Sequence, residues 1–197
     1  MIPKGKGAHL GGRPPSYVPE SPVPVPKLHI RDARVSDAEM IEAVHYSSRE
    51  AVYDGQVADW PPPGPDRPGR IERWKEWLAD PAITCVVGES DGEILGFCTI
   101  RASLDEGEDA SVAEMPTLYV RPDSWHLGYG RALCEAGLEE ARKRGFRTLT
   151  LWVLEMNRRA RDFYKEFGFH PDGGTKVDEL TTERLVAFRY RIDLTRR

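Results

Sequence analysis

The sequence has few cysteines, no long apolar run and no excess of positive charge. Its three cysteines, Cys85, Cys98 and Cys134, lie in apolar stretches without the CxxC spacing that is typical of metal and redox sites. We interpret them as reduced core thiols, since their odd number also argues against a disulfide framework. Cys134 as a nucleophile is the weaker alternative, because nothing in the sequence pairs it with a base. No metal is expected in this protein.

Charge and hydropathy exclude two further kinds of partner. The net charge of -4 and the isoelectric point of about 5.8 show no basic footprint, so nucleic acid is not an expected partner. No apolar run approaches the ~18 residues of a transmembrane helix, so a membrane is not an expected partner either. Lys4 and Lys6 are not followed by the apolar segment of a secretory signal, so we expect a cytoplasmic protein.

Residues 1–27 differ in composition from the rest of the chain. Six prolines from Pro14 to Pro26 lie among glycines and small residues. Such a segment cannot bury enough apolar surface to offset the entropy that is lost when it becomes ordered. We therefore predict a disordered, proline-rich tail over 1–27 and one folded domain over 28–197, a length that can bury a stable core.

In the domain, the apolar spacing alternates between the periods of strands and helices. Asp91-Gly92 separates two alternating runs and predicts a hairpin, and Pro116 inside another run predicts an edge or a bulge. The predicted strands cover 28–33, 83–89, 93–103, 112–120, 148–154, a short strand from Phe169, and 185–194. The first predicted helix begins at Ser36 or Asp37, and the second carries Ile71, Trp74 and Leu78 on one face. Two further helices are predicted over 130–144 and 157–167. This order predicts an α/β or α+β fold around one central sheet.

The stretch from Leu118 to Leu133 runs from a strand through a turn with two glycines into a helix. Gly128 and Gly130 let the backbone bend tightly and expose its N–H groups, and the helix N-terminus adds a positive dipole end. Together they form a cradle for a pyrophosphate, to which Arg131 adds a point charge. A tight turn without a ligand is the alternative. Walker and dinucleotide loops fit worse, because the residues after Gly130 match neither pattern.

The next strand and helix make the turn more informative. The helix carries an Asn-x-x-Ala-x-x-Phe-Tyr-x-x-x-Gly-Phe pattern, formed by Asn157, Ala160, Phe163, Tyr164, Gly168 and Phe169. With Trp125-His-Leu-Gly128-Tyr-Gly130 upstream, the chain resembles the GNAT acetyltransferase superfamily over roughly residues 28–194. The resemblance implies a GNAT-like acyl-CoA N-acyltransferase fold: a mixed, mostly antiparallel central sheet flanked by helices. Its parallel strands, here 112–120 and 148–154, would splay apart.

The resemblance also implies a function. The protein would be an N-acetyltransferase that moves the acetyl group of acetyl-CoA directly to a primary amine of a small molecule or a protein. The implied cofactor-binding residues are Leu118, Tyr119, Val120, His126, Leu127, Gly128, Tyr129, Gly130, Arg131, Ala132, Asn157 and Tyr164. The backbone from Leu118 to Val120 would pair with the pantetheine arm. Trp125 departs from the family, which has Gln or Arg there, so one side-chain hydrogen bond to the cofactor would be missing.

Direct transfer needs a base near the amine and an acid near the leaving sulfur. Tyr164 holds the family position of the acid, and its ordinary pKa of ~10 suits protonation of a thiolate. Glu114, just upstream of the cofactor-binding strand segment, is the candidate base, either directly or through water. The sequence agrees equally well with Glu114 as a solvated carboxylate at the strand end. Tyr46, Tyr53 and Glu114 are the candidate acceptor-binding residues, with His45 and Trp60 as weaker ones.

Alternatives remain open at this point. A non-catalytic acyl-CoA-binding sensor or interaction module on the same fold gains some weight from Trp125, and an acyl donor other than acetyl-CoA is a weaker idea. The acidic stretch 105–109 hints at a cationic acceptor, although such a loop is usually just solvated. Homodimers are common among such proteins, so the resemblance leaves a homodimer open.

Overall fold

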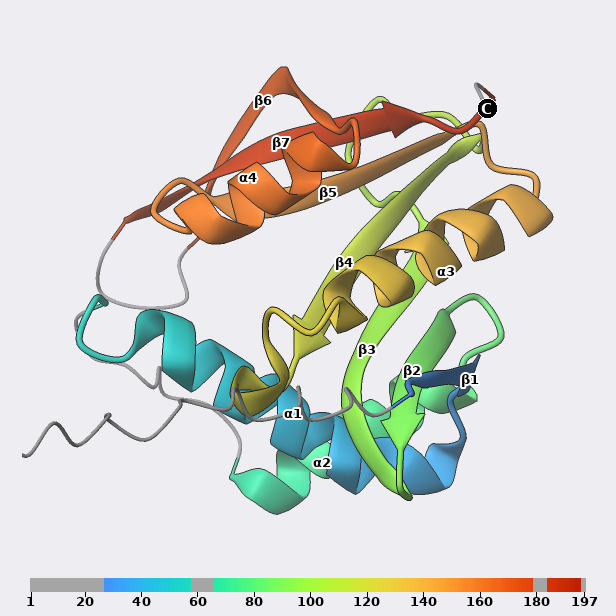
Figure 1. The fold of residues 1–197 in the computed structure, drawn as a ribbon. Coiled ribbons are helices and arrows are strands. Elements are labelled where there is room, and N and C mark those ends of the chain that lie inside the picture. The colour runs from blue at the N-terminus through green and yellow to red at the C-terminus, as the bar shows by residue number, and fades with distance from the viewer. Residues whose placement is uncertain (1–26, 58–65, 179–183, 196–197) are drawn as a thin grey trace, which may run out of the picture.

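The computed structural model describes residues 27–57, 66–178 and 184–195 (Figure 1). The predicted tail and Trp60 lie outside these described residues. The described strands are β1 (His29–Asp32), β2 (Thr84–Ser90), β3 (Glu93–Ala102), β4 (Val112–Val120), β5 (Thr148–Leu154), β6 (His170–Asp178) and β7 (Leu185–Asp193). The described α-helices are α1 (Ala38–Tyr53), α2 (Arg67–Ala79), α3 (Tyr129–Lys143) and α4 (Arg158–Glu166). Their bounds agree closely with the sequence prediction.

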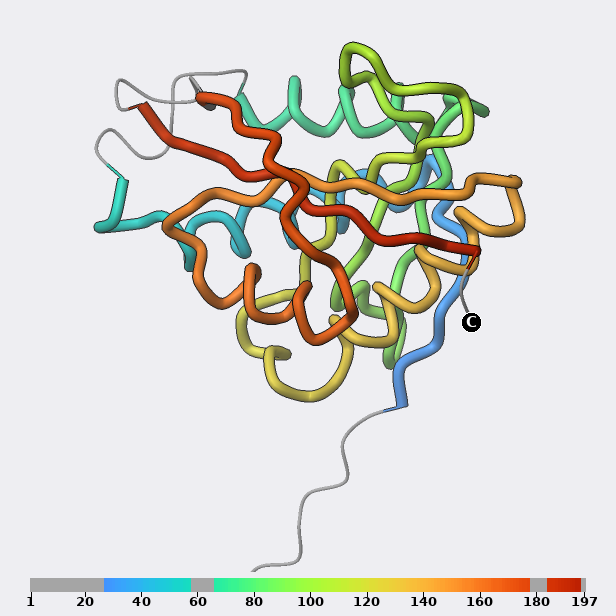
Figure 2. Tube along the Cα trace, turned by 90° about the horizontal axis from the view of Figure 1, so that it is seen from above, coloured from blue at the N-terminus to red at the C-terminus, as the bar shows by residue number. Residues whose placement is uncertain are grey.

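The described strands form one sheet in the order β1-β2-β3-β4-β5-β7-β6, with α1 and α2 on one face and α3 and α4 on the other (Figure 2). Only the β4–β5 pair is parallel. α3 is amphipathic, and Leu133, Leu138 and Ala141 are buried against the sheet. The predicted fold class, a mixed and mostly antiparallel sheet flanked by helices, is confirmed.

Local turn chemistry fixes the edges of several elements. Asp91 and Gly92 both have positive φ, at 51° and 80°, and close the predicted β2–β3 hairpin. One prediction was wrong: the strand after Phe169 is not short, because β6 covers nine residues, His170–Asp178. Its sequence has little strand character, but pairing with β7 stabilises it on both sides of an irregularity between Pro171 and Thr175.

The predicted irregularity at Pro116 lies where the two halves of the sheet diverge. Thr99 pairs with Thr117, and Arg101 pairs with Glu114, so β4 has one residue more than β3 between these pairs. The extra residue is a bulge, which bends and twists its strand. The parallel pairing of β4 with β5 then ends at Glu114. Beyond that point the two strands splay apart, as predicted (Figure 1).

Candidate active site

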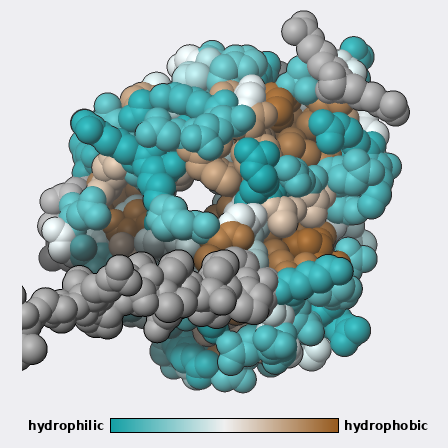
Figure 3. Space-filling model, viewed as in Figure 1, coloured by the Kyte–Doolittle hydropathy of each residue, from teal (hydrophilic) through white to brown (hydrophobic). Residues whose placement is uncertain are grey.

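A cavity of about 520 Å³ lies where β4 and β5 separate. Four parts of the chain surround it: α1, the end of β4, the turn before α3, and α4. Its lining residues are Ser48, Arg49, Val52, Tyr53, Leu118, Tyr119, Val120, Ser124, Trp125, His126, Gly128, Gly130, Arg131, Asn157, Arg159, Ala160, Asp162, Phe163, Tyr164 and Glu166. In the same view as Figure 1, the space-filling picture shows an opening between β4, α4 and α1 (Figure 3).

The end of β4 offers backbone groups to this cavity. The Arg121 N–H donates to the Leu95 carbonyl at 2.8 Å, so Tyr119, two residues earlier, also directs its backbone groups toward β3. In an antiparallel ladder the alternate residues, here Leu118 and Val120, direct their N–H and C=O groups to the other side. That side faces the gap between the splayed strands. An extended ligand in the gap can therefore pair with β4 as a strand would.

The turn before α3 has the geometry of an anion cradle. Gly128 is the N-cap of α3 with a φ of 83°, a left-handed conformation in which a side chain would be strained. An added Cβ would meet nothing within 4 Å at Gly128, whereas at Gly130 it would make ordinary van der Waals contact with Phe163 at 3.6 Å and Val120 at 3.8 Å, so the turn is open at Gly128. The first N–H groups of α3 point out of its N-terminus, where the helix dipole favours an anion.

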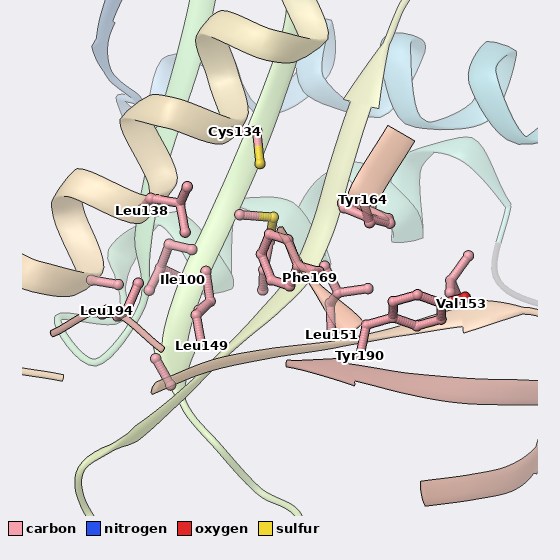
Figure 4. Close-up of a cluster of buried hydrophobic side chains, with 13 residues drawn as sticks. Ile100, Cys134, Leu138, Leu149, Leu151, Val153, Tyr164, Phe169, Tyr190 and Leu194 are labelled. Atoms are coloured by element: carbon pink, nitrogen blue, oxygen red, sulfur yellow. The ribbon is translucent and has the colours of Figure 1, made fainter. Parts of the chain in front are cut away.

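Tyr164 and Asn157 reach the cavity from α4 and its cap. The Asn157 side-chain oxygen accepts the Ala160 N–H at 3.1 Å, which confirms the predicted N-cap. Tyr164 is 8% exposed and packs edge-on against Phe169, with ring centroids 5.6 Å apart, at the border between the cavity and an apolar cluster (Figure 4). Burial raises the pKa of the Tyr164 phenol well above its ordinary value, so the phenol keeps its proton at neutral pH.

Glu114 is buried but is not part of the cavity lining. One of its carboxylate oxygens accepts two hydrogen bonds from the Arg101 guanidinium, at 3.1 and 3.3 Å. The same guanidinium lies over the Trp77 ring, 5.5 Å from its centroid, on the face that α2 covers. The ion pair with Arg101 engages this carboxylate outside the cavity lining. The structure thus does not bring Glu114 into direct reach of the acceptor.

The structure divides the remaining predicted site residues into two groups. Those that line the cavity are Leu118, Tyr119, Val120, His126, Gly128, Gly130, Arg131, Asn157, Tyr164 and Tyr53. Those outside its lining are Leu127, Tyr129, Ala132 and Tyr46. Leu127 is 40% exposed, and Tyr129 is buried in the core beneath the turn. Tyr46 is turned toward α2, where the Arg70 guanidinium lies 5.0 Å from its ring centroid.

Sequence reasoning named Tyr53 in the α1 wall of the cavity but missed Ser48, Arg49 and Val52. Ser48 is 3% exposed, and its hydroxyl donates to the Val120 carbonyl at 2.9 Å, which ties α1 to the end of β4. Arg49 and Val52 line the cavity beside it. The signal was present as a small polar residue on the apolar face of a helix, but the sequence does not show which strand lies opposite.

Buried Glu42 fixes α1 against α2. It is 1% exposed, accepts the Trp74 indole N–H at 3.1 Å and forms an ion pair with Arg70. His45 lies in the same cluster, with ring centroids 5.0 Å from Tyr119 and 5.4 Å from Trp74, and it is not in the cavity lining. Burial lowers the pKa of His45, which is therefore neutral at neutral pH. This cluster positions the α1 wall and supports no acceptor-binding role for His45.

The acidic loop between β3 and β4 is partly solvated, with Glu106 and Asp109 exposed, and partly paired with β7. Asp105 accepts from the Trp152 indole at 3.1 Å and pairs with Arg189 at 3.2 Å. Glu108 pairs with both Arg189 and Arg191 at 2.9 Å. Cations of β7 thus engage Asp105 and Glu108, and the loop is not part of the cavity lining, so the hint of a cationic acceptor gains no support from the described residues.

Comparison with known proteins identifies the family. The profile of the acetyltransferase (GNAT) family matches residues 49–169, which includes the turn, Tyr164 and most of the cavity. The chain is 38% identical to the uncharacterized N-acetyltransferase MJ1207 of Methanocaldococcus jannaschii over 107 residues, which are 50% of this chain and 46% of that protein. It is 26% identical to the uncharacterized N-acetyltransferase YhfO of Bacillus subtilis over 147 residues, 75% of this chain and 93% of YhfO.

Solved structures agree on the fold. The PaiA N-acetyltransferase of Thermoplasma acidophilum, solved in complex with coenzyme A, matches with a TM-score of 0.57 at 20% identity. The match covers 83% of this chain and 98% of that one. The chain thus has the GNAT fold and belongs to the GNAT acetyltransferase family, as its motifs implied. It spans about half the length of MJ1207 and nearly all of YhfO.

Two searches of the described residues found nothing. None of the helices in this part of the chain combines the length and the apolarity that a membrane crossing needs. Nor does it contain a group of three or more histidine, cysteine and acidic side chains arranged to hold a metal ion.

Proposed function

We propose that this protein binds acetyl-CoA in the splayed cavity and transfers its acetyl group directly to a primary amine of a small molecule or a protein. The observation that carries the proposal is that Tyr164, the open turn at Gly128 and Gly130, and the free side of β4 all face one cavity. Family membership supports the same reading.

The chain would hold acetyl-CoA with backbone groups at both ends of the cavity. The N–H groups at the start of α3 would hold the pyrophosphate, since the space beside Gly128 is open. Leu118 would pair with the pantetheine arm through its outward N–H and C=O groups, and Val120 through its N–H, because the Val120 carbonyl already accepts from Ser48 and Trp125. Asn157, at the cap of α4, lines the wall and would contact the arm.

Bound acetyl-CoA supplies an acetyl thioester, whose acetyl carbon bonds to the acceptor nitrogen while its bond to sulfur breaks. Tyr164 would give its proton to the departing sulfur, because the thiol rather than the thiolate is the main form of such a group at neutral pH. The acceptor nitrogen loses a proton in the same process and needs a route for it to water or a base. The walls formed by α1, with Ser48, Arg49 and Tyr53, would receive the acceptor.

The first experiment is a thermal melt of the purified protein with acetyl-CoA. At ~100 times its dissociation constant the ligand adds about 2.7 kcal/mol, which raises the Tm by roughly 5–10 °C in a domain of this size. Amine-dependent release of free thiol from acetyl-CoA then separates an enzyme from the non-catalytic sensor. A shift without turnover on any amine would favour the sensor, and no shift at millimolar acetyl-CoA or longer acyl-CoAs would refute the proposal.

We expect Glu114→Gln to change stability more than catalysis. Loss of the carboxylate leaves the Arg101 guanidinium, whose side chain is 23% exposed, without its charged partner, which costs about 1–3 kcal/mol. Because Glu114 is outside the cavity lining, we expect kcat to stay within about tenfold of the wild-type value. The measurements are a denaturant melt and kcat as a function of pH.

The matched control for this variant is Glu72→Gln, since the Glu72 side chain is 65% exposed, pairs with Lys75 at 3.0 Å and is outside the cavity lining. That control should leave both stability and kcat unchanged, because exposed ion pairs contribute little. A fall in kcat of about 100-fold in Glu114→Gln, with loss of the acid limb of the pH profile, would instead establish Glu114 as the base.

A further inference from the structure

Trp125 stands where the family motif has a polar side chain, and the structure shows what it does there. Its indole N–H donates to the Val120 carbonyl at 2.6 Å, the same oxygen that accepts the Ser48 hydroxyl. The bond fixes the indole against the end of β4. Trp125 thus occupies one of the outward backbone groups of β4, and its ring becomes a rigid part of the cavity wall.

The Arg159 guanidinium lies on this ring. Its central carbon is 3.3 Å from the ring centroid, which is the distance of a flat stack rather than of a loose contact. Arg159 comes from the first turn of α4, so the stack joins the two sides of the splayed cavity. In such a stack the N–H groups of a guanidinium point outward in its plane, free of the aromatic face that holds it.

Arg159 has an unusual electrostatic setting for a cation. Although Arg159 is exposed, no carboxylate of the described residues lies at ion-pair distance from its guanidinium, and partial burial lowers its pKa. Asp162, which also lines the cavity, pairs with Lys165 instead. A cation at a helix N-terminus is also disfavoured by the helix dipole. An anion in the cavity would give the Arg159 guanidinium the acidic partner that the described residues do not supply.

Arg131, the residue predicted to supply the charge, lines the cavity but has other contacts. It pairs with Glu135 at 3.3 Å, and its guanidinium lies 4.7 Å from the Phe167 ring centroid. The turn therefore presents backbone N–H groups, while its own arginine is engaged along α3. A phosphate held by those groups would have Arg159, across the cavity, as the cation with no acidic partner among the described side chains.

We propose that Arg159, held flat by Trp125, is the side-chain donor to a phosphate of the CoA moiety in this chain. Two residues thus replace the missing polar side chain of the motif: Trp125 positions the Arg159 guanidinium, and Arg159 binds the phosphate. This inference rests on the proposed function, because it takes the cavity to be the cofactor site.

The test measures Kd by calorimetry for CoA and for dephospho-CoA, which lacks the 3′-phosphate. Arg159→Gln should weaken CoA binding about 10- to 100-fold, the value of a charge-assisted hydrogen bond to phosphate. An equal loss for dephospho-CoA assigns Arg159 to the pyrophosphate, and a loss for CoA alone assigns it to the 3′-phosphate. Arg158→Gln, at the exposed neighbouring cation, is the matched control and should change Kd less than twofold.

Two variants of Trp125 test the positioning role. Trp125→Leu removes the aromatic platform and should weaken CoA about as much as Arg159→Gln, with no further loss in the double variant, because both changes remove one contact. Trp125→Phe keeps an aromatic platform and should keep most of the affinity for CoA. If Trp125 acted only through its indole N–H, Trp125→Phe would lose as much affinity as Trp125→Leu. The melting temperature without ligand checks that each variant is folded.

Unchanged affinity in Arg159→Gln would overturn the inference, as would an equal loss in Arg158→Gln or fully additive losses in the double variant. These results are distinct from failure of the proposed function, in which the wild-type protein itself would bind neither CoA nor dephospho-CoA.

Discussion

Replacement of Tyr164 by phenylalanine is expected to lower kcat about 100-fold, the usual contribution of a general acid, while the Kd for acetyl-CoA changes less than about twofold. The variant removes one oxygen atom from a ring that is 8% exposed and held between Phe163 and Phe169, so the packing is kept. What is lost is the proton donor at the cavity wall. Steady-state kinetics with an active amine and calorimetry with acetyl-CoA give the two numbers.

Tyr190→Phe is the matched control for this prediction. Tyr190 is 1% exposed, belongs to the same apolar cluster and contacts Arg161 at 3.4 Å, but it does not line the cavity. Its variant should keep the wild-type kcat. An equal fall in both variants would indicate damage to the cluster, and an unchanged kcat in Tyr164→Phe would remove the acid role from Tyr164.

The pKa of Tyr164 adds a pH signature. An acid works only in its protonated form, which exists below its pKa. Burial raises that pKa above the ordinary ~10, so Tyr164 stays protonated at higher pH than a solvated tyrosine. We therefore expect no loss of kcat from Tyr164 as the pH rises from 7 to about 10 in the wild type. A decline that begins near pH 8 and disappears in Tyr164→Phe would show that the phenol is not buried as described.

The parts of the site that depend on local chemistry were predictable from the sequence. Gly128 takes the left-handed conformation that its turn requires, and Asn157 caps α4 through its side chain. Pro116 lies at the bulge beyond which β4 and β5 separate. Each of these outcomes depends on a few neighbouring residues, so a motif that preserves their spacing also preserves their geometry.

The parts that depend on distant side chains were not predictable. Arg131 follows the turn and lines the cavity, but its contacts with Glu135 on α3 and with Phe167 at the end of α4 could not be predicted from the turn. Glu114 looked like a free carboxylate at a strand end, but the register of β3 places Arg101 beside it. Pairings of this kind depend on packing between elements far apart in the chain, which spacing along one segment does not encode.

The same limit explains why the acceptor is not identified by the motifs. The cofactor side is built from one continuous stretch, from β4 through the turn to α4. The α1 wall comes from another part of the chain, and its position depends on the buried Glu42 cluster and on the bond from Ser48 to Val120. A prediction of acceptor specificity therefore has to start from the walls around Arg49 and Tyr53 rather than from the family signature.

The largest effect on cofactor binding is expected from Gly130→Val. The first carbon of a side chain fits at this position, since an added Cβ would lie 3.6 Å from Phe163 and 3.8 Å from Val120, so Gly130→Ala should fold and bind with a modest loss. The two further methyl groups of valine reach past that carbon and would press on Phe163 and Val120 in the cavity wall, beside the first N–H groups of α3, where the pyrophosphate would lie. Loss of two hydrogen bonds to a charged phosphate, at about 1.5–3 kcal/mol each, costs at least about 100-fold, and we expect that loss in the Kd for acetyl-CoA.

A thermal melt makes this expectation quantitative. At the acetyl-CoA concentration that equals ~100 Kd for the wild type, a 100-fold weaker variant is only half saturated, and its stabilisation falls from about 2.7 to about 0.4 kcal/mol. The Tm shift should therefore shrink from roughly 5–10 °C to roughly 1–2 °C. The unliganded Tm of the alanine and valine variants shows whether α3 still begins correctly. If the valine variant is folded and keeps the full shift, the cofactor does not lie on this turn, and the cavity needs another occupant.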